Sequence, residues 1–297
     1  MPQFAEKRFH QAEGVYEQFI KSEKLKVKSE ELNYKPQTAN YKLETPLFTF
    51  NSSLLTSIVP HAPYSTSLEL MQLINEHSAG KVITIHNQET LEEERFFIKG
   101  DSEFQKLFKQ FNIDISFYKP GGKTSLQTYL PYLNKASHLI LVHNTFTNEE
   151  DVLKVNNETS TSKLTSSSQL ETLSSAISQL STFFCLCPNA NLYIENALPP
   201  VELFRKHGCD IVVGTDSLAS NHSLSILDEL KTLHQHFPQV PLEELLQWAT
   251  LNGAKALKMH GKLGSFEKGK QPGVVCIDGD LRNVRTLIGG IKGMGIV

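Results

Sequence analysis

Short apolar runs that end in polar residues recur along this chain. The clearest run is Val82–Ile85, which is followed by His86 and, three residues later, by Glu89. Val, Ile and Thr favour an extended backbone, so this run predicts a buried strand with polar groups at its carboxyl end. Four further runs end in the same way: Ser57–Val59 before His61, Leu139–Val142 before His143, Phe183–Cys187 before Pro188, and Ile211–Val213 before Asp216. We therefore expect five strands that deliver polar residues at their ends.

Helical periodicity separates these runs. Apolar residues three and four positions apart predict helices over residues 4–21, 66–80, 92–100, 102–111, 126–133, 203–207, 223–237 and 241–249. The charged segment 24–47 has little periodicity and is expected to be irregular. Strand and helix thus alternate along the chain, which is typical of βα repeats around a parallel sheet and predicts an α/β fold.

Two segments interrupt this alternation. A helix that starts near Glu150 is expected to end at Asn156, where a Ser/Thr-rich stretch begins; we interpret residues 156–180 as a surface insertion. From residue 261 the chain is Gly-rich and then apolar, which predicts a turn and a strand. The expected domains are a barrel-type unit over residues 1–260 and a small β segment over 261–297.

Composition narrows the class of partner. The chain has 297 residues, with 29 basic and 32 acidic side chains and a formal charge of −3, and it contains no long Lys/Arg cluster. This balance argues against a nucleic acid or a membrane surface as partner and favours a small-molecule substrate. The four cysteines include no Cys-x-x-Cys pair, and no run of about 18 apolar residues occurs, so we expect a soluble cytoplasmic protein.

The polar strand ends suggest metal-assisted hydrolysis. Parallel strands bring their carboxyl ends to one face, as in a (β/α)8 barrel, so residues distant in sequence become neighbours. His86 and Asp216 are expected to bind one divalent ion, Zn or Fe, because imidazole and carboxylate suit these metals. Such an ion lowers the pKa of a coordinated water, and Glu89 is placed to move protons between the nucleophile and a leaving nitrogen.

The remaining strand-end residues are expected to act on the substrate. His143 and His61 could donate hydrogen bonds to the substrate or to the tetrahedral intermediate, and Asp216 could also accept a proton from the attacking water. We therefore take Glu89, Asp216 and His143 as catalytic and His61 and His143 as substrate-binding. The simpler alternatives are a capping pair for His86 and Glu89 and a turn residue for Asp216. Asn189 and Asn191 are expected to be amides that stabilise a loop.

Several motifs together resemble the amidohydrolase superfamily. The segments that carry the resemblance are Pro60–Ser65, His86-x-x-Glu89-Thr90, Val142–Thr145, Gly214–Asn221 and Thr250–Leu257. The most similar branch contains metal-dependent deaminases and chlorohydrolases, such as cytosine deaminases and methylthioadenosine deaminases. The resemblance implies that His86 and Asp216 bind metal on barrel strands five and eight, that Glu89 is the proton shuttle, and that His143 and His61 contact the substrate.

One departure from the family pattern changes the expectation. The family begins with a small β-sandwich and a first barrel strand that ends in His-x-His, but no such pair precedes His61 here, and His234-x-His236 lies in a predicted helix. We therefore expect a partial (β/α)8 barrel, about strands four to eight, with a C-terminal remnant of the β-sandwich and impaired activity. The alternative is a non-catalytic remnant that serves as a binding or interaction protein. Open sheet edges also predict a homo-oligomer.

Overall fold

Four parallel strands form the main sheet of this protein. The computed structural model describes residues 5–18, 57–115, 118–164, 180–277, 281 and 284–288. The strands are β1 (Val82–Asn87), β2 (His138–His143), β3 (Ser181–Leu186) and β4 (Asp210–Val213). They are hydrogen-bonded in the order of the sequence, and every neighbouring pair is parallel. The predicted α/β class is confirmed, and because every pair is parallel, all four carboxyl ends lie at one edge of the sheet.

Helices follow and precede these strands as the periodicity predicts. The α-helices after the helix at residues 5–18 are α2 (Leu68–His77), α3 (Leu91–Lys99), α4 (Glu103–Gln110), α5 (Ser125–Tyr129), α6 (Glu149–Leu164), α7 (Pro188–Glu195), α8 (Val201–Lys206), α9 (Ile226–His236), α10 (Leu242–Gln247) and α11 (Gly253–Ala256). Short turns of other helix types lie at η2 (Pro63–Ser65), η3 (Leu130–Tyr132) and η5 (Trp248–Asn252). Within the described residues no helix is both long and apolar enough to span a bilayer.

The helices cover one face of the sheet and build the main core. Strand residues that alternate along β1–β4 pack against apolar side chains from α2, α5, α6, α8, α9 and α10. The alternate positions of β2, β3 and β4, among them Ile140, Phe183 and Val212, form a second cluster on the other face with Ala256 of α11. The period of two along each strand thus produces two separate apolar layers.

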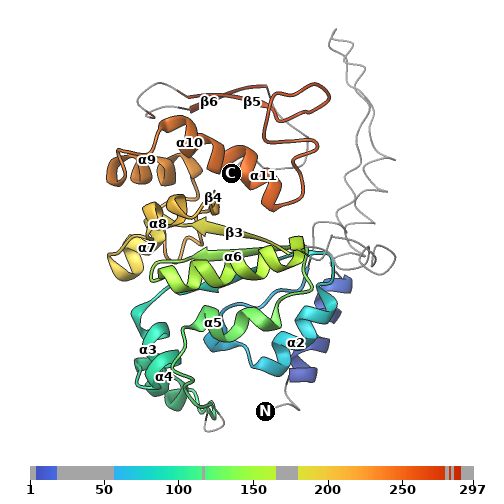
Figure 1. Ribbon diagram of the computed structural model, residues 1–297, viewed down its shortest axis with the longest axis vertical. Helices are drawn as coiled ribbons and strands as arrows, with labels where there is room; N and C mark the ends of the chain where they lie inside the picture. Colours follow the sequence, from blue (N-terminus) through green and yellow to red (C-terminus); the bar gives the residue numbers. More distant parts are fainter. Residues whose placement is uncertain are drawn as a thin grey trace.

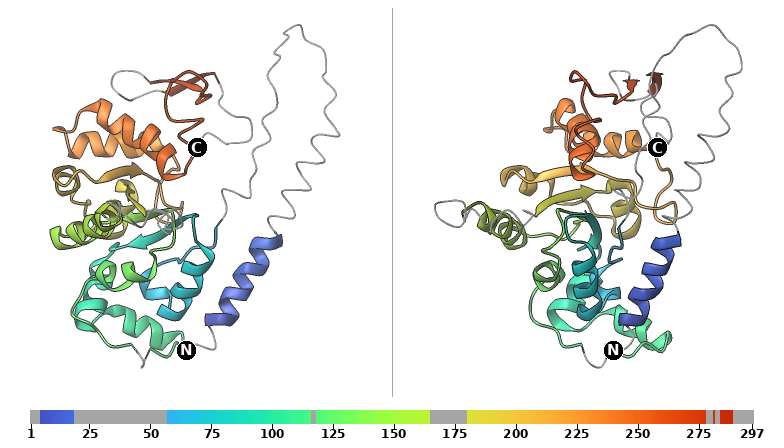
Figure 2. Two further views of the ribbon diagram at one scale, coloured as in Figure 1. Left: turned by 45° about the vertical axis from the view of Figure 1, so that its right-hand side comes forward. Right: turned by 90° about the vertical axis from the view of Figure 1, so that its right-hand side faces the viewer.

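The N-terminal helix packs beside α2. Figure 2 shows the helix at residues 5–18, in blue, beside the cyan part of the chain that contains α2. Phe9 belongs to a small cluster with Ile58 and Ile74, and Tyr16 meets the His77 ring edge-on at 5.4 Å. The predicted helix over residues 4–21 is confirmed for residues 5–18, whereas the segment 24–47 lies outside the described residues.

The predicted strand at Ser57–Val59 is wrong. Residues 57–60 have no regular secondary structure, although the carbonyl oxygen of His61 accepts a hydrogen bond of 3.0 Å from the backbone N–H of His86. Pro60 and Pro63 lack an N–H, so this segment cannot continue a ladder along the edge of β1. The segment lies beside β1 without becoming a fifth strand.

The predicted end of the helix before the Ser/Thr-rich stretch is wrong. Helix α6 does not end at Asn156 but continues to Leu164, and a Lys154–Glu158 ion pair of 3.1 Å supports its added turns. Residues 165–179 of the expected insertion lie outside the described residues.

At the C-terminal end, β5 (Val274–Ile277) and β6 (Val284–Ile288) form a two-stranded antiparallel sheet, visible at the top of Figure 1.

Replacing Phe184 tests the core that the sheet shares with its helices. This side chain is buried, and its ring stacks on Phe204 with centroids 4.7 Å apart. Phe184→Ala should lower the free energy of unfolding by about 3–5 kcal/mol, because it removes apolar contact and leaves a cavity. Phe266→Ala, at a side chain 78% exposed, is the matched control and should change stability by less than about 0.5 kcal/mol. Equal midpoints for both variants in urea unfolding would contradict this description of the core.

Candidate functional site

Three predicted site residues meet at the carboxyl edge of the sheet. His86 lies near the end of β1, His143 is the last residue of β2, and Asp216 follows β4. One ligand atom from each of these residues lies within 4.8 Å of the other two. The parallel pairing therefore brings together side chains that are up to 130 positions apart in sequence (216 − 86 = 130).

His86 is held in one tautomer by the neighbouring segment. Its Nδ1 atom donates a hydrogen bond of 2.8 Å to the carbonyl oxygen of His61. A carbonyl can only accept, so the neutral ring keeps its proton on Nδ1 and presents the Nε2 lone pair. That Nε2 atom is 3.7 Å from Oδ1 of Asp216, whose interaction raises the pKa of His86 despite the opposing effect of burial. The irregular segment at His61 thus orients a side chain on β1.

His143 is fully buried and clamped by Asn191 of α7. The Nδ1 atom of His143 donates to Oδ1 of Asn191 at 2.7 Å, and Nδ2 of Asn191 donates to the backbone carbonyl of His143 at 3.3 Å. Nε2 of His143 is buried and has no hydrogen-bond partner among the described residues. A buried acceptor without a protein partner is costly, so this atom is suited to bind a metal ion or a donor group of a ligand.

Asp216 presents one carboxylate oxygen to the site while the other is held. Ser220 donates its hydroxyl to Oδ2, which leaves Oδ1 facing His86. Burial by itself would raise the pKa of Asp216, but His86, Ser220 and the nearby His143 lower it to about 2. The carboxyl group is therefore ionised at neutral pH, as metal ligation requires.

Gly214 allows the chain before Asp216 to approach β3 closely. A Cβ atom at this position would lie 2.8 Å from Sγ of Cys185. The backbone N–H of Gly214 donates to the carbonyl of Leu186 at 2.9 Å and so extends the pairing of β4 beyond its last strand residue. A side chain here would push the Asp216 loop away from its neighbours.

Glu89 reaches the same point from the loop after β1. Its Oε1 atom is 3.5 Å from Nε2 of His143, and its side chain is 15% exposed. The backbone N–H groups of Gln88 and Glu89 donate to the two carboxylate oxygens of Glu93, at 2.9 and 3.2 Å. The Glu89 carboxylate therefore faces the histidines, whereas the Glu93 carboxylate binds the backbone N–H groups of the same loop.

His61 lies at the outer side of the group. Its ring centroid is 4.8 Å from that of His86, and its Nδ1 atom lies 3.1 Å from the hydroxyl of Ser65. Burial and the neighbouring His86 lower the pKa of His61, so the ring is neutral at neutral pH. All five residues predicted for the site, His61, His86, Glu89, His143 and Asp216, therefore lie together.

Strained backbone marks the same strand ends. Gln88, His143, Asn144 and Asp216 have φ angles of +47°, +76°, +59° and +57°. Residues other than glycine rarely adopt such angles, and they persist only where surrounding contacts fix them. The strain coincides with the loops that aim Glu89, His143 and Asp216.

Three supporting residues were not predicted from the sequence. Asn191 was expected to stabilise a loop, but it lies in α7 and orients His143. Glu93 and Ser220 received no role, although each contacts a site loop. The spacing Thr90-x-x-Glu93 is a capping-box signal that could have drawn attention to Glu93, whose N–H does donate to Thr90 Oγ1 at 3.2 Å.

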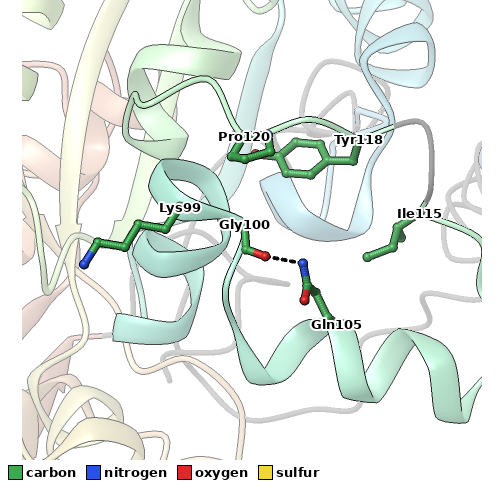
Figure 3. A pocket seen from close by; sticks show the side chains of 6 residues that line it. All are labelled: Lys99, Gly100, Gln105, Ile115, Tyr118 and Pro120. Atoms are coloured by element: carbon green, nitrogen blue, oxygen red, sulfur yellow. Dashed lines mark hydrogen bonds between the residues drawn. The ribbon is translucent and has the colours of Figure 1, made fainter.

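Other features do not join this group. His234 and His236, the only His-x-His pair of the sequence, are exposed on α9. A surface cavity of about 480 Å³ is lined by residues of α3, α4 and the segment before α5. Figure 3 shows its lining, which includes Lys99, Gln105 and Tyr118. Its lining contains none of the five predicted site residues.

The three-residue group is suited to a divalent metal. Both histidines have Nδ1 committed to an acceptor and keep Nε2 available, and Asp216 contributes a carboxylate oxygen. Two imidazoles and one carboxylate match the donors that Zn²⁺ takes in catalytic sites, where three protein ligands leave a position open for water. Within the described part of the chain, His86, His143 and Asp216 form the single such group.

Comparison with curated proteins finds deaminases among the relatives of this chain. A 5-methylthioadenosine/S-adenosylhomocysteine deaminase of Thermoanaerobacter pseudethanolicus is 37% identical over 100 residues, which are 31% of this chain and 23% of that protein. An adenosine deaminase of Helicobacter pylori is 26% identical over 231 residues, covering 74% of this chain and 49% of that protein. The chain thus spans about half or less of the length of the curated relatives it matches.

Solved structures show the same fold. The aminofutalosine deaminase of Helicobacter pylori in complex with methylthio-coformycin superimposes with a TM-score of 0.55 at 25% identity, covering 73% of this chain and 48% of that chain. A zinc-bound adenosine deaminase from Xanthomonas campestris gives a TM-score of 0.52 at 22% identity, covering 75% and 43%. The four parallel strands are therefore consistent with part of the barrel of these enzymes.

The family of this chain is shown by a third comparison, with models of protein families. The model of the amidohydrolase family matches residues 8–295, which is nearly the whole of the 297-residue chain. The resemblance inferred from the sequence motifs is thereby confirmed, and this chain belongs to the amidohydrolase family.

Proposed function

We propose that this chain carries the site of a metal-dependent hydrolase that breaks non-peptide C–N bonds in a small heterocycle or nucleoside. The observation that carries the proposal is the buried Nε2 atom of His143, which lacks a hydrogen-bond partner among the described residues and faces His86 and Asp216. His86 and Asp216 would hold the ion, as the sequence suggested. His143, which the sequence assigned to catalysis and substrate binding, lies close enough to be the third donor.

The reaction divides into roles for the residues of this chain. A divalent ion held there by His86, His143 and Asp216 would lower the pKa of water so that hydroxide is available near neutral pH. In the deamination that we propose, the water oxygen bonds to a ring carbon, the C–N bond to the amino group breaks, and ammonia leaves. Glu89 accepts the proton of the water at its carboxylate and passes it to the departing nitrogen. His61, neutral and at the rim, is placed to hydrogen-bond the heterocycle.

The substrate class rests on the relatives. Those cited above are named deaminases of adenosine and methylthioadenosine, and one binds methylthio-coformycin. We accordingly assign purine nucleosides as the first substrates to assay, by ammonia release from adenosine, 5-methylthioadenosine and S-adenosylhomocysteine.

We also assign residues 1–260 to the barrel domain and residues 261–297, with the β5–β6 sheet, to the C-terminal part of a β-sandwich.

Metal analysis of the purified chain is the first test. The donor set predicts about one equivalent of Zn or Fe per chain. His86→Ala, His143→Ala and Asp216→Asn should each lower zinc affinity by about tenfold or more, whereas His234→Ala, at an exposed position on α9, should leave it unchanged. Less than about a tenth of an equivalent in the parent chain would overturn the proposal and favour a non-catalytic binding protein. Unchanged affinity in His143→Ala would return this residue to a role with the substrate.

Zinc affinity should depend on pH through His86. The pKa of His86 is raised above 6.5 by Asp216, and the protonated ring cannot bind metal. Zinc must therefore displace a proton below that pKa, so affinity falls by about tenfold per pH unit there and becomes level above it. Asp216→Asn removes the cause of the raised pKa and should move the fall to lower pH. Calorimetric titration from about pH 5 to 8 measures both, and an affinity independent of pH in the parent chain would contradict the ligand assignment.

Glu89→Gln separates the proton shuttle from metal binding. An amide cannot accept the proton of the attacking water, so kcat should fall by about 10²–10⁴-fold while the zinc content stays near that of the parent chain. Glu150→Gln makes the same chemical change at an exposed position of α6 and should leave kcat unchanged. If Glu89→Gln retained more than about half of the parent activity on the preferred nucleoside, Glu89 would not be the shuttle.

A further inference from the structure

Glu93 is a buried carboxylate that the proposed reaction does not use. It lies in the first turn of α3, is fully buried, and both of its oxygens are occupied. Oε1 accepts from the backbone N–H of Gln88 and from the hydroxyl of Ser125 at 2.5 Å, and Oε2 accepts from the backbone N–H of Glu89 at 3.2 Å. Burying a carboxylate costs free energy unless hydrogen-bond donors surround it. The three donors around Glu93 offset this cost.

The N–H groups that Glu93 binds belong to the loop that carries Glu89. Gln88 has a φ angle of +47°, which turns the chain sharply between His86 on β1 and Glu89. This turn is what lets both side chains reach the site, where Glu89 lies 3.5 Å from His143. A left-handed residue without a compensating contact would relax, and the bonds from Gln88 N and Glu89 N to Glu93 supply that contact.

The side chain of Gln88 fixes the same loop through other partners. Its Nε2 atom donates to Oδ2 of Asp151 at 2.7 Å, and its Oε1 atom accepts from the hydroxyl of Thr147 at 2.7 Å. These contacts hold Gln88 to α6 and to the loop after β2, but none of them touches Glu89. The backbone of Glu89 is held by Glu93 instead.

We propose that Glu93 is a positioning residue, which holds the backbone of Gln88 and Glu89 so that the Glu89 carboxylate faces His143. The inference rests on the proposed function in so far as Glu89 is the proton shuttle. Glu93 itself touches neither the metal donors nor the point where they converge. Its effect is therefore on the placement of Glu89 and not on metal binding.

Glu93→Gln tests this role with two independent measurements. The variant keeps the size of the side chain but turns an NH₂ group toward one of the bound donors, so one N–H loses its acceptor. Hydrogen exchange at the amides of residues 88 and 89 should become at least about tenfold faster. In the nucleoside assay kcat should fall at least about tenfold, with KM within about threefold and zinc content unchanged, a split that general destabilisation would not produce. Glu94→Gln, the next residue of α3 and partly exposed, is the control and should match the parent chain.

A milder pair of variants covers the case in which Glu93→Gln does not fold. Ser125→Ala removes one donor from Glu93, and Thr128→Ala removes a hydroxyl of the same helix whose bond, in the described part of the chain, is to the carbonyl of Thr124. Exchange at residues 88 and 89 should rise about threefold in the first variant and remain unchanged in the second. Equal exchange in folded Glu93→Gln and Glu94→Gln, or in Ser125→Ala and Thr128→Ala, overturns the inference. If the parent chain deaminates no nucleoside, the proposed function fails, while the exchange comparison still decides what Glu93 holds.

Discussion

Parallel pairing of β1–β4 is the constraint on which the rest of this structure depends. In a parallel sheet every carboxyl end lies at the same edge, so the residues after each strand become neighbours whatever their separation in sequence. His86 and His143 lie at the carboxyl ends of β1 and β2, Asp216 follows β4, and ligand atoms of the three converge within 4.8 Å. The apolar layers on the two faces fix the register, because a slip of one residue would exchange the two sets of side chains.

The polar loops at this buried edge need hydrogen-bond partners, and amide side chains provide them. Asn87 donates to Asn144 at 2.9 Å and accepts from the hydroxyl of Tyr129 at 2.7 Å, and Asn144 donates in turn to the carbonyl of Cys185 at 3.1 Å. These bonds join the loops after β1 and β2 to β3. Buried networks of this kind are stabilising only when every member is satisfied, so they fix one arrangement of the loops. Asn191 extends the same principle to His143.

The sequence predicted the parts of this structure that depend on periodicity and strand ends. Four strands and most helices follow from apolar spacing, and His86, Glu89, His143 and Asp216 were identified because each follows an apolar run. The strand at Ser57–Val59 was wrong because a short apolar run beside two prolines carries no information on whether its N–H groups find partners. Asn191, Glu93 and Ser220 were missed because their roles arise from contacts across tens of residues or within a loop. Spacing along the chain gives no signal for the contacts of Asn191 and Ser220, and the capping-box spacing at Thr90 marks Glu93 as a helix-start residue without showing that it binds the Glu89 loop.

The pKa values of two carboxyl groups near this site are shifted in opposite directions. Asp216 is surrounded by His86, His143 and a donating hydroxyl, which together lower its pKa to about 2 in spite of burial. Glu93 is buried among neutral donors and lies near Glu89, and burial raises its pKa to about 7 although Ser125 and two N–H groups oppose the rise. The first environment favours a permanent anion that can face a cation, whereas the second makes a charge costly and its hydrogen bonds indispensable. An apolar side chain in place of Glu93 would leave two backbone N–H groups and the Ser125 hydroxyl without their acceptor, so the strained turn depends on an acceptor at this position. The strained turn and the buried acid therefore explain each other, and together they place Glu89.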